Sequence, residues 1–240
     1  MDFAFITKPG TRDYNEDSVR VSQNETGSLF VVADGLGGHG KGEIASAIVT
    51  DTFEKSFVGA RVDPACFIPE TILAAQHLIL QEQKAQRATF AMKTTCAALL
   101  VAGGICRIGH VGDTRAYVFQ KNKVKFQTLD HSVPQMLVRS GAIKEKHIRR
   151  HPDRNRLLRV MGINWETPGY ELSANIPLAE CQAFLLCTDG FWELCHEKQM
   201  SAFLKKSGNA SEWLALMTKE VEKNGRNQDM DNYTAIAVRC

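Results

Sequence analysis

Acidic residues recur in this chain at the points where runs of apolar, strand-forming residues begin or end. The residues that share this placement are Glu16, Asp17, Asp34, Asp113, Asp189 and Asp231. A carboxylate at the end of a core strand is held firmly by the backbone and can still reach an opening that it shares with others. Several such charges in one opening would repel one another strongly unless cations neutralised them.

The residue types also indicate which cation would suit such a site. Oxygen ligands with no required His or Cys favour a hard divalent ion, Mg²⁺ or Mn²⁺, over Zn²⁺. The alternative for each single Asp is a local role as the cap of a helix or turn. The repeated strand-edge placement favours a common metal site.

A glycine-dense segment follows Asp34 directly and formally matches two phosphate-binding motifs. The spacing Gly35-x-Gly37-x-x-Gly40 is that of a dinucleotide fingerprint, and the run from Gly35 to Gly40-Lys41 is close to a P-loop. Both motifs place a phosphate at a turn between a strand and a helix, so both are alternatives to a metal site.

Neither phosphate-binding motif is complete. Gly42 stands where a P-loop has the Ser or Thr hydroxyl that binds magnesium. A dinucleotide site requires a second parallel strand and an acidic residue about 20 positions on. Glu54 is near that count but falls within a predicted helix, and neither motif explains Asp34.

The elements that must position these residues follow from apolar runs and their periodicity. Short runs rich in Val, Ile, Phe and Tyr predict strands at 3–6, 19–22, 28–33, 96–101, 105–108, 115–119, 124–127, 183–187 and 233–238. Apolar residues at helical spacing predict helices over 43–58 and 65–86, and a third that Asn209 and Glu212 cap. Short turns between many strands indicate antiparallel hairpins. The pattern predicts an α+β fold in which helices cover antiparallel sheets.

Composition excludes several classes of protein. The chain is 44% hydrophobic and 23% charged, with a net charge of +2, which argues against disorder and against nucleic acid as a partner. No signal-peptide pattern and no apolar run of membrane-spanning length occur, and the seven cysteines form no CxxC pair. We therefore expect a cytoplasmic protein with free thiols, no membrane insertion and a single domain over residues 1–240.

The ordered set of motifs resembles the metal-dependent protein phosphatases of the 2C type, in their compact bacterial form. The matching segments run along the whole chain: Arg12-x-x-Asn15-Glu16-Asp17, residues 32–39 (VADGLGGH), Thr94-Thr95, residues 109–115 (GHVGDTR), Asp130-His131-Ser132 with Gly141, Thr188-Asp189-Gly190, and Asp231-Asn232-x-Thr234. Each segment alone is a weak signal, but their order is highly specific to the family.

The resemblance implies a four-layer α-β-β-α sandwich with two central antiparallel sheets and a small flap subdomain at about 130–165. It also implies two core Mn²⁺ or Mg²⁺ ions and a weaker third ion. Asp34 would bridge the two core ions, and the Gly35 carbonyl would bind one of them. The remaining ligands would be Asp17, Asp113, Asp189 and Asp231, with Glu16 and Asn232 in supporting positions.

The implied reaction is hydrolysis of phosphoserine and phosphothreonine in proteins. Two ions about 3.5–4 Å apart lower the pKa of a bridging water, which attacks the phosphorus directly. Asp34 and Asp189 are thus the expected catalytic metal ligands. Arg12 would bind the phosphate through its planar fork, although alone it could equally be a surface residue paired with Asp13 or Glu16.

Two residues of the glycine-rich segment bear on proton transfer. Eukaryotic relatives carry His directly after the Asp-Gly pair, as the proposed general acid, whereas this chain has Leu36. Bacterial relatives commonly have an apolar residue there, so the difference does not exclude activity. We interpret His39 as a structural loop residue.

Residues 121–160 are strongly basic, with eleven Lys and Arg against Asp130, Glu145 and Asp153. One interpretation is a solvated helical face. The other is that a flap beside the cleft attracts anionic phosphoprotein segments. Nucleic acid is less favoured, because Phe126 is the single aromatic residue available to stack on a base.

We therefore expect a monomeric enzyme that acts on phosphorylated Ser/Thr proteins and opposes a cognate Ser/Thr kinase. One alternative is a catalytically silent relative that binds phosphoproteins. Such relatives typically lose a metal-site Asp, and none is missing here. The other alternative is a P-loop nucleotide hydrolase.

Overall fold

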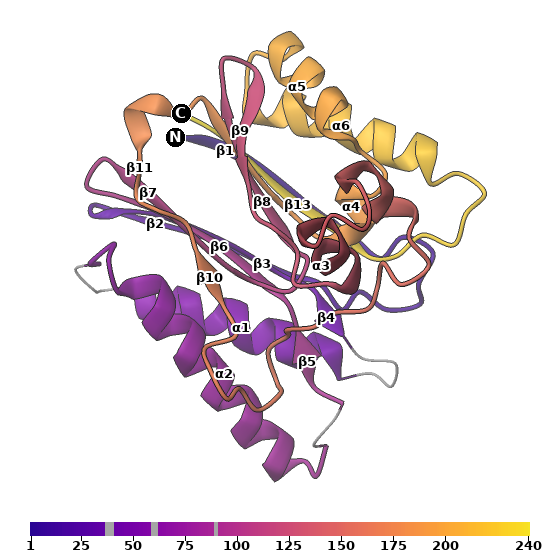
Figure 1. Ribbon diagram of the computed structural model, residues 1–240. Coiled ribbons are helices and arrows are strands. Elements are labelled where there is room, and N and C mark those ends of the chain that lie inside the picture. The colour runs from indigo at the N-terminus through magenta and orange to yellow at the C-terminus, as the bar shows by residue number, and fades with distance from the viewer. Residues whose placement is uncertain (37–40, 59–61, 89–90) are drawn as a thin grey trace.

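Two antiparallel sheets lie face to face, and helices cover the outer face of each (Figure 1). The computed structural model describes residues 1–36, 41–58, 62–88 and 91–240. The four layers confirm the predicted α+β sandwich. Gly37, Gly40 and His39, which the sequence singled out, lie outside the described residues.

The first sheet has five strands in the order β1 (Asp2–Lys8), β13 (Tyr233–Arg239), β12 (Ala183–Cys187), β8 (Arg115–Gln120) and β9 (Lys123–Gln127). The second sheet follows the order β10 (Glu171–Leu172), β7 (Ile105–Val111), β6 (Cys96–Ala102), β3 (Gly27–Ala33) and β2 (Ser18–Asn24), and β11 (Ile176–Pro177) also pairs with β7. A short ribbon joins β4 (Gly35–Leu36) to β5 (Lys93–Thr94). The two ends of the chain meet in the first sheet, where β1 pairs with β13.

The central strands are buried on both faces because each sheet packs against a second sheet and a helix pair. In β3, Phe30 and Val32 face the core between the sheets, whereas Leu29, Val31 and Ala33 face the helices. This alternation follows from the two-residue period of side chains along a strand. The β3 strand is therefore apolar over most of its length. It ends at Ala33, so Asp34 lies at the end of the sheet where the strand stops.

Helices α1 (Gly42–Phe57) and α2 (Phe67–Ala85) cover the second sheet, and α5 (Glu197–Lys206) and α6 (Ala210–Asn224) cover the first. The Asn209 side chain accepts a hydrogen bond of 2.8 Å from the Glu212 backbone N–H at the start of α6. This is the cap that the sequence predicted. The four-residue helix α4 (Asp189–Trp192) follows β12 directly.

The predicted flap falls in the segment between β9 and β10, and we keep that name for residues 130–165. It contains α3 (Val133–Arg139) and the 3₁₀ helix η1 (Glu145–Arg150), and a second 3₁₀ helix, η2 (Leu178–Glu180), follows β11. An isolated bridge joins Ser132 to Leu157 within the segment, and a second joins Met161 of the segment to Thr94 of β5.

All nine predicted strands and all three predicted helices are present, with ends that differ by a few residues. Three further helices, α3, α4 and α5, were not predicted, since each is too short to show a long helical period. The sheet order is incompatible with the dinucleotide-binding and P-loop alternatives. The strand β3 lies antiparallel to both of its neighbours, β2 and β6, where those motifs require a parallel sheet.

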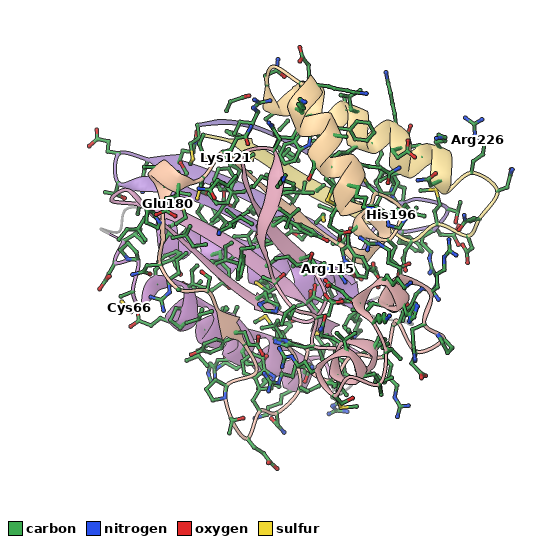
Figure 2. All side chains as sticks on the ribbon, turned by 45° about the horizontal axis from the view of Figure 1, so that its top comes forward. Cys66, Arg115, Lys121, Glu180, His196 and Arg226 are labelled. Carbon is green, nitrogen blue, oxygen red and sulfur yellow. The ribbon has the colours of Figure 1, made fainter. Side chains whose placement is uncertain are left out.

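Side chains fill the space between the layers, and Arg115 lies among them, whereas Lys121, Glu180 and Arg226 lie at the periphery (Figure 2). Within the described part of the chain, none of the helices combines the length and the apolar character needed to cross a membrane. All seven cysteines are free thiols.

Candidate active site

A cleft of about 920 Å³ opens at one end of the two sheets and collects most of the residues predicted from the sequence. These residues come from five separate parts of the chain and include Arg12, Glu16, Asp34, Gly35, Asp113, Asp189, Asp231 and Asn232. Leu36 also lines the cleft, and the flap contributes Asn155 and Leu157. Asp17 lies next to it, where its Oδ2 accepts a hydrogen bond of 3.0 Å from the Thr188 hydroxyl.

Backbone hydrogen bonds hold Asp34 and Gly35 at the end of β3. The Thr94 hydroxyl donates to the Asp34 carbonyl oxygen at 2.7 Å, and the Asp34 N–H donates to the Thr95 hydroxyl at 3.0 Å. A Cβ on Gly35 would lie 2.5 Å from the backbone of both Glu16 and Gly42. Only glycine therefore fits at this position.

The loops that carry Arg12 and Asp231 are joined through Asn232. Its side-chain oxygen accepts a hydrogen bond of 2.8 Å from the Glu16 N–H, and its amide donates to the carbonyls of Pro9 and Tyr14 at 2.9 Å. Arg12 pairs with Asp231 at 3.1 Å, and not with Asp13 or Glu16 as the surface-residue alternative supposed. Its guanidinium stands at the mouth of the cleft, about half exposed.

Burial and the charges of neighbouring carboxylates make five acidic residues in or beside the cleft hard to ionise. Burial, followed by the charges of neighbouring carboxylates, raises the pKa of Asp34 and of Asp189 well above the usual range. Burial likewise raises the pKa of Asp17 and of Asp113 to about 7. The pKa of Glu16 is also raised, chiefly by burial. Without a cation, the site thus favours protonated carboxyl groups.

Two carboxylate oxygens in this site have unused capacity to bind a cation. Asp17 Oδ1 and Asp113 Oδ1 are buried, and neither finds a hydrogen-bond partner among the described residues. A buried carboxylate oxygen without a partner is costly, and a cation would remove that cost. The residues present therefore fit hard divalent cations with oxygen ligands.

Comparison with known proteins agrees with this geometry. A family model described as protein phosphatase 2C matches residues 10–233. The chain belongs to the protein phosphatase 2C family. It is therefore a protein phosphatase, and the family is metal-dependent.

Individual relatives match over nearly the full length. The serine/threonine phosphatase stp of Listeria welshimeri is 29% identical, over 99% of this chain and 95% of that protein. The crystal structure of serine/threonine phosphatase Stp1 from Staphylococcus aureus superposes with a TM-score of 0.90 at 29% identity, covering 100% of this chain and 95% of that chain. The structure of PstP/Ppp from Mycobacterium tuberculosis gives 0.82 at 26% identity, covering 99% and 97%.

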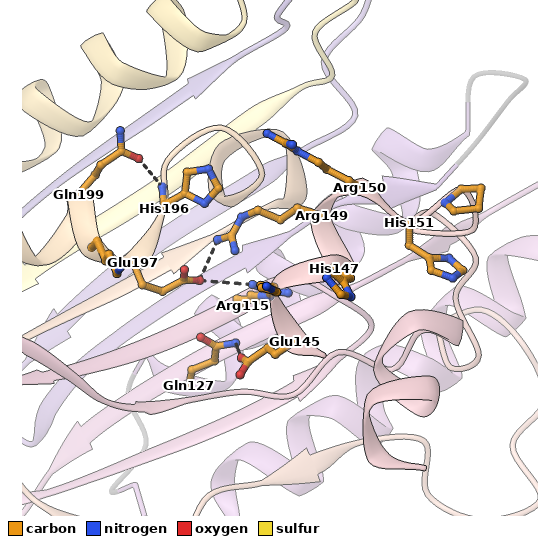
Figure 3. Close-up of a pocket in the computed structure, with 13 residues that line it drawn as sticks. Arg115, Gln127, Glu145, His147, Arg149, Arg150, His151, His196, Glu197 and Gln199 are labelled. Carbon is orange, nitrogen blue, oxygen red and sulfur yellow. Dashed lines mark hydrogen bonds and ion pairs between the residues drawn. The ribbon is translucent and has the colours of Figure 1, made fainter. Parts of the chain in front are cut away.

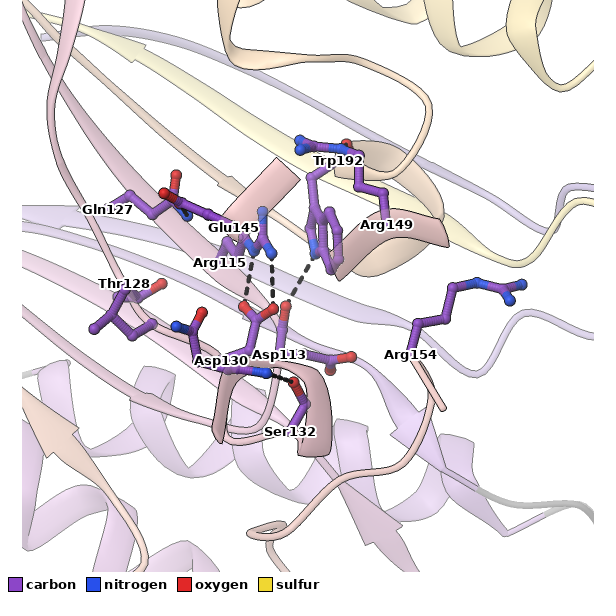
Figure 4. A network of polar contacts seen from close by, with 12 residues as sticks. Asp113, Arg115, Gln127, Thr128, Asp130, Ser132, Glu145, Arg149, Arg154 and Trp192 are labelled. Atoms are coloured by element: carbon purple, nitrogen blue, oxygen red, sulfur yellow. Dashed lines mark hydrogen bonds and ion pairs between the residues drawn. The ribbon is translucent and has the colours of Figure 1, made fainter. Parts of the chain in front are cut away.

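Behind the cleft, the phosphatase has a buried polar network that the sequence analysis did not single out (Figure 4). The Arg115 guanidinium donates to both oxygens of Asp130, at 2.8 and 2.7 Å, and stacks on the Trp192 ring at 3.5 Å. The Trp192 indole N–H donates to the Asp113 carbonyl oxygen at 3.0 Å. The network thus connects β8 and the start of the flap to the backbone of a predicted metal ligand.

A second group of potential ligands, His110, His131 and Glu171, has its ligand atoms within 4.8 Å of one another. His131 Nδ1 accepts from the Gly112 N–H at 3.1 Å, so the neutral ring carries its proton on Nε2, beside Glu171. Burial, reinforced by His110, lowers the pKa of His131 to about 3.

The same carboxylate already has two cationic neighbours. Arg139 and Arg159 lie 3.3 and 3.7 Å from Glu171 Oε1. A cation at this place would have to displace them and the Nε2 proton. We therefore assign the group a structural role at the base of the flap, separate from the carboxylate cleft.

Proposed function

We propose that this phosphatase hydrolyses phosphoserine and phosphothreonine in proteins at the carboxylate cleft. The ligands of two core ions, Mn²⁺ or Mg²⁺, would be Asp17, Asp34, the Gly35 carbonyl, Asp189 and Asp231, and Asp113 with Asp189 would hold a weaker third. Glu16 and Asn232 would support them. The observation that carries the proposal is the gathering of carboxylates at one cleft, where burial raises the pKa of Asp34 and Asp189. Asp17 and Asp113 each have an oxygen that finds no hydrogen-bond partner in the described part of the chain.

When bound, the ions would lower the pKa of a water and would screen the charge of the phosphoryl oxygens. The side chains of the chain position the substrate around them. Arg12 can donate two parallel N–H hydrogen bonds to the phosphate. Its side chain is about half exposed at the mouth of the cleft, so it can leave Asp231 and bind the phosphate. Leu36 cannot donate a proton, so the leaving group receives none from that position.

The proposed biological substrates are phosphorylated proteins, including those of a Ser/Thr kinase that this enzyme would oppose. The names of the bacterial relatives, serine/threonine phosphatases from Listeria and Mycobacterium, support this substrate class. The catalytically silent alternative has no support in the site, since every predicted carboxylate is present at or beside the cleft.

The test is phosphate release from an aryl phosphate and from a phosphothreonine peptide, with and without Mn²⁺. We expect EDTA or Asp189→Asn to reduce turnover by at least about a thousandfold, because each removes the charge that organises the attacking water. Asp13→Asn is the matched control, since Asp13 lines the same cleft but is exposed. Full turnover in EDTA, or in the Asp189 variant, contradicts the metal mechanism.

A further inference from the structure

A second, larger cleft of about 1100 Å³ lies between η1 of the flap and the start of α5 (Figure 3). Arg115, Arg149 and Glu197 form its inner part, and the side chains that line it with exposed ends are Glu145, Lys146, Arg150 and Lys198. The carboxylates of the catalytic cleft do not line it. It is therefore a separate surface of the enzyme.

The inner cations of this second cleft already have partners. Glu197 Oε1 lies 2.7 Å from Arg149 and 3.6 Å from Arg115, and the Arg149 Nε donates to the Trp192 carbonyl oxygen at 3.0 Å. Glu145 accepts a hydrogen bond from the Gln127 amide at 3.3 Å. These contacts position the inner part of the cleft, and they use the two carboxylates that line it.

The outer cations, in contrast, remain available. Among the described residues, Lys146, Arg150 and Lys198 take part in none of the ion pairs of the protein. Two of them come from the flap and one from α5, so the positive charge surrounds the opening from two sides. His147, His151 and His196 add hydrogen-bonding groups to the same lining. An opening of this kind attracts an anionic ligand.

The chemistry of the lining distinguishes between anions. None of the lining residues within the described chain is Phe, Tyr or Trp, so the rings on which a nucleic acid base could stack are limited to the imidazoles of the lining histidines. An extended peptide needs only cations and hydrogen-bonding groups along its path. The outer residues come from two elements, η1 and α5, so an extended ligand can contact both.

The catalytic cleft gives a reason for a separate docking surface. Among its described lining residues Arg12 is the cationic side chain, and it is assigned to the phosphate, so acidic residues that flank a phosphorylated side chain find no further cation there, whereas the second cleft offers three. The stacked Arg115 and Trp192 side chains separate the inner part of the second cleft from Asp113. We propose that the second cleft binds an acidic, Asp- or Glu-rich segment of the phosphoprotein substrate. This inference rests on the proposed function of the catalytic cleft.

The experiment uses the charge-reversed variant Lys146→Glu/Arg150→Glu/Lys198→Glu. Its control, Lys205→Glu/Lys206→Glu/Lys219→Glu, makes the same charge change at exposed positions of α5 and α6 outside the cleft. Substrates are an aryl phosphate, a phosphothreonine peptide with neutral flanks, and the same peptide with a Glu-rich extension. We expect the cleft variant to raise KM for the Glu-rich peptide by about tenfold or more and to leave the aryl phosphate unchanged within about twofold.

A binding measurement separates this inference from the proposed catalytic function. Fluorescence anisotropy of a labelled, unphosphorylated Glu-rich peptide should show binding to the wild type and to the control variant. Binding should be weaker by about tenfold in the cleft variant and should fall as salt is added. The inference is wrong if the two variants behave alike, or if a single-stranded oligonucleotide binds the cleft more tightly than the peptide. Peptide binding without any phosphate release would instead contradict the proposed catalytic function alone.

Discussion

At the scale of single residues, Asp17 shows how a buried carboxylate beside the catalytic cleft can bind a cation and at the same time destabilise the fold when that cation is absent. Its Oδ1 has no hydrogen-bond partner among the described residues, and burial raises its pKa from the usual value of 3.8 to about 7. The charges of Asp231 and Glu16 add to this rise in pKa, while the hydroxyl of Thr188, which donates to Asp17 Oδ2, opposes it. An ionised carboxylate that is buried without a neighbouring cation is unfavourable, so ionised Asp17 lowers the free energy of unfolding of the cation-free protein.

This environment predicts how stability depends on pH when cations are removed. Between about pH 4 and about pH 7 the folded state holds more protons at Asp17 than the unfolded state does. In EDTA the contribution of Asp17 to stability therefore falls as pH rises through this window. Asp17→Asn should remove that contribution, so its advantage over the wild type should be larger at about pH 8 than at about pH 5.

Thermal unfolding in EDTA at both pH values measures this difference, with Asp13→Asn as the exposed control. Each 1 kcal/mol of relieved repulsion corresponds to about 2–4 °C in a protein of this size. Mn²⁺ at about pH 8 should stabilise the wild type more than the Asp17 variant. Equal responses of the two proteins to pH and to Mn²⁺ would show that Asp17 does not contribute to a cation site.

At the scale of elements, the Arg115–Asp130 pair attaches the beginning of the flap to β8. Both side chains are 2% exposed, and the guanidinium donates to both carboxylate oxygens. Removing one partner leaves an uncompensated charge inside the protein, which is far more costly than losing an exposed pair. Arg20 and Asp51 provide the exposed comparison, at 2.7 Å and with side chains 39% and 40% exposed.

We expect Asp130→Asn to lower the free energy of unfolding by about 3–5 kcal/mol and Asp51→Asn by less than about 1 kcal/mol. Urea unfolding of the two variants and the wild type measures both values. Similar small losses from both substitutions would mean that water or a rearranged Glu197 compensates Arg115. The network in Figure 4 would then not hold the flap.

At the scale of the whole molecule, the two sheets share a core that joins the helical layers into one unit. Phe30, Val32 and Leu99 of the second sheet pack against Phe184 and Ile236 of the first. Neither helix pair can separate without its sheet, and neither sheet can separate without exposing this shared core. We therefore interpret residues 1–240 as one cooperative domain.

This interpretation predicts a single unfolding transition. Trp165 packs on the α1–α2 side, and Trp213 is buried on the α5–α6 side. We consider one variant that retains only Trp165 and one that retains only Trp213, each with Phe at the other tryptophan positions. In each variant, the urea midpoint measured by tryptophan fluorescence should equal the midpoint measured by far-UV circular dichroism. A difference between the two probes in either variant would show that the layers unfold separately.

The sequence determined the elements and the candidate residues because both depend on local patterns. The apolar runs identify β3, β12 and β13, and the position of Asp34 or Asp189 at the end of such a run needs no information from distant residues. The order of motifs identified the family for the same reason. Short helices such as α5 escaped prediction, since their stability comes from the sheet they cover.

Only the tertiary structure shows which charged side chains form ion pairs and which line the open second cleft without an ion-pair partner among the described residues. Arg149 and Arg150 are adjacent in the sequence, yet one pairs with Glu197 and the other lines the open cleft. Arg115 and Asp130 lie in two of the family motifs, but the sequence does not show that the packing of α4 and the flap buries them together against Trp192. Contacts between segments so far apart depend on how the layers pack. No local pattern in the sequence records that packing, and so the second cleft became visible only in the folded chain.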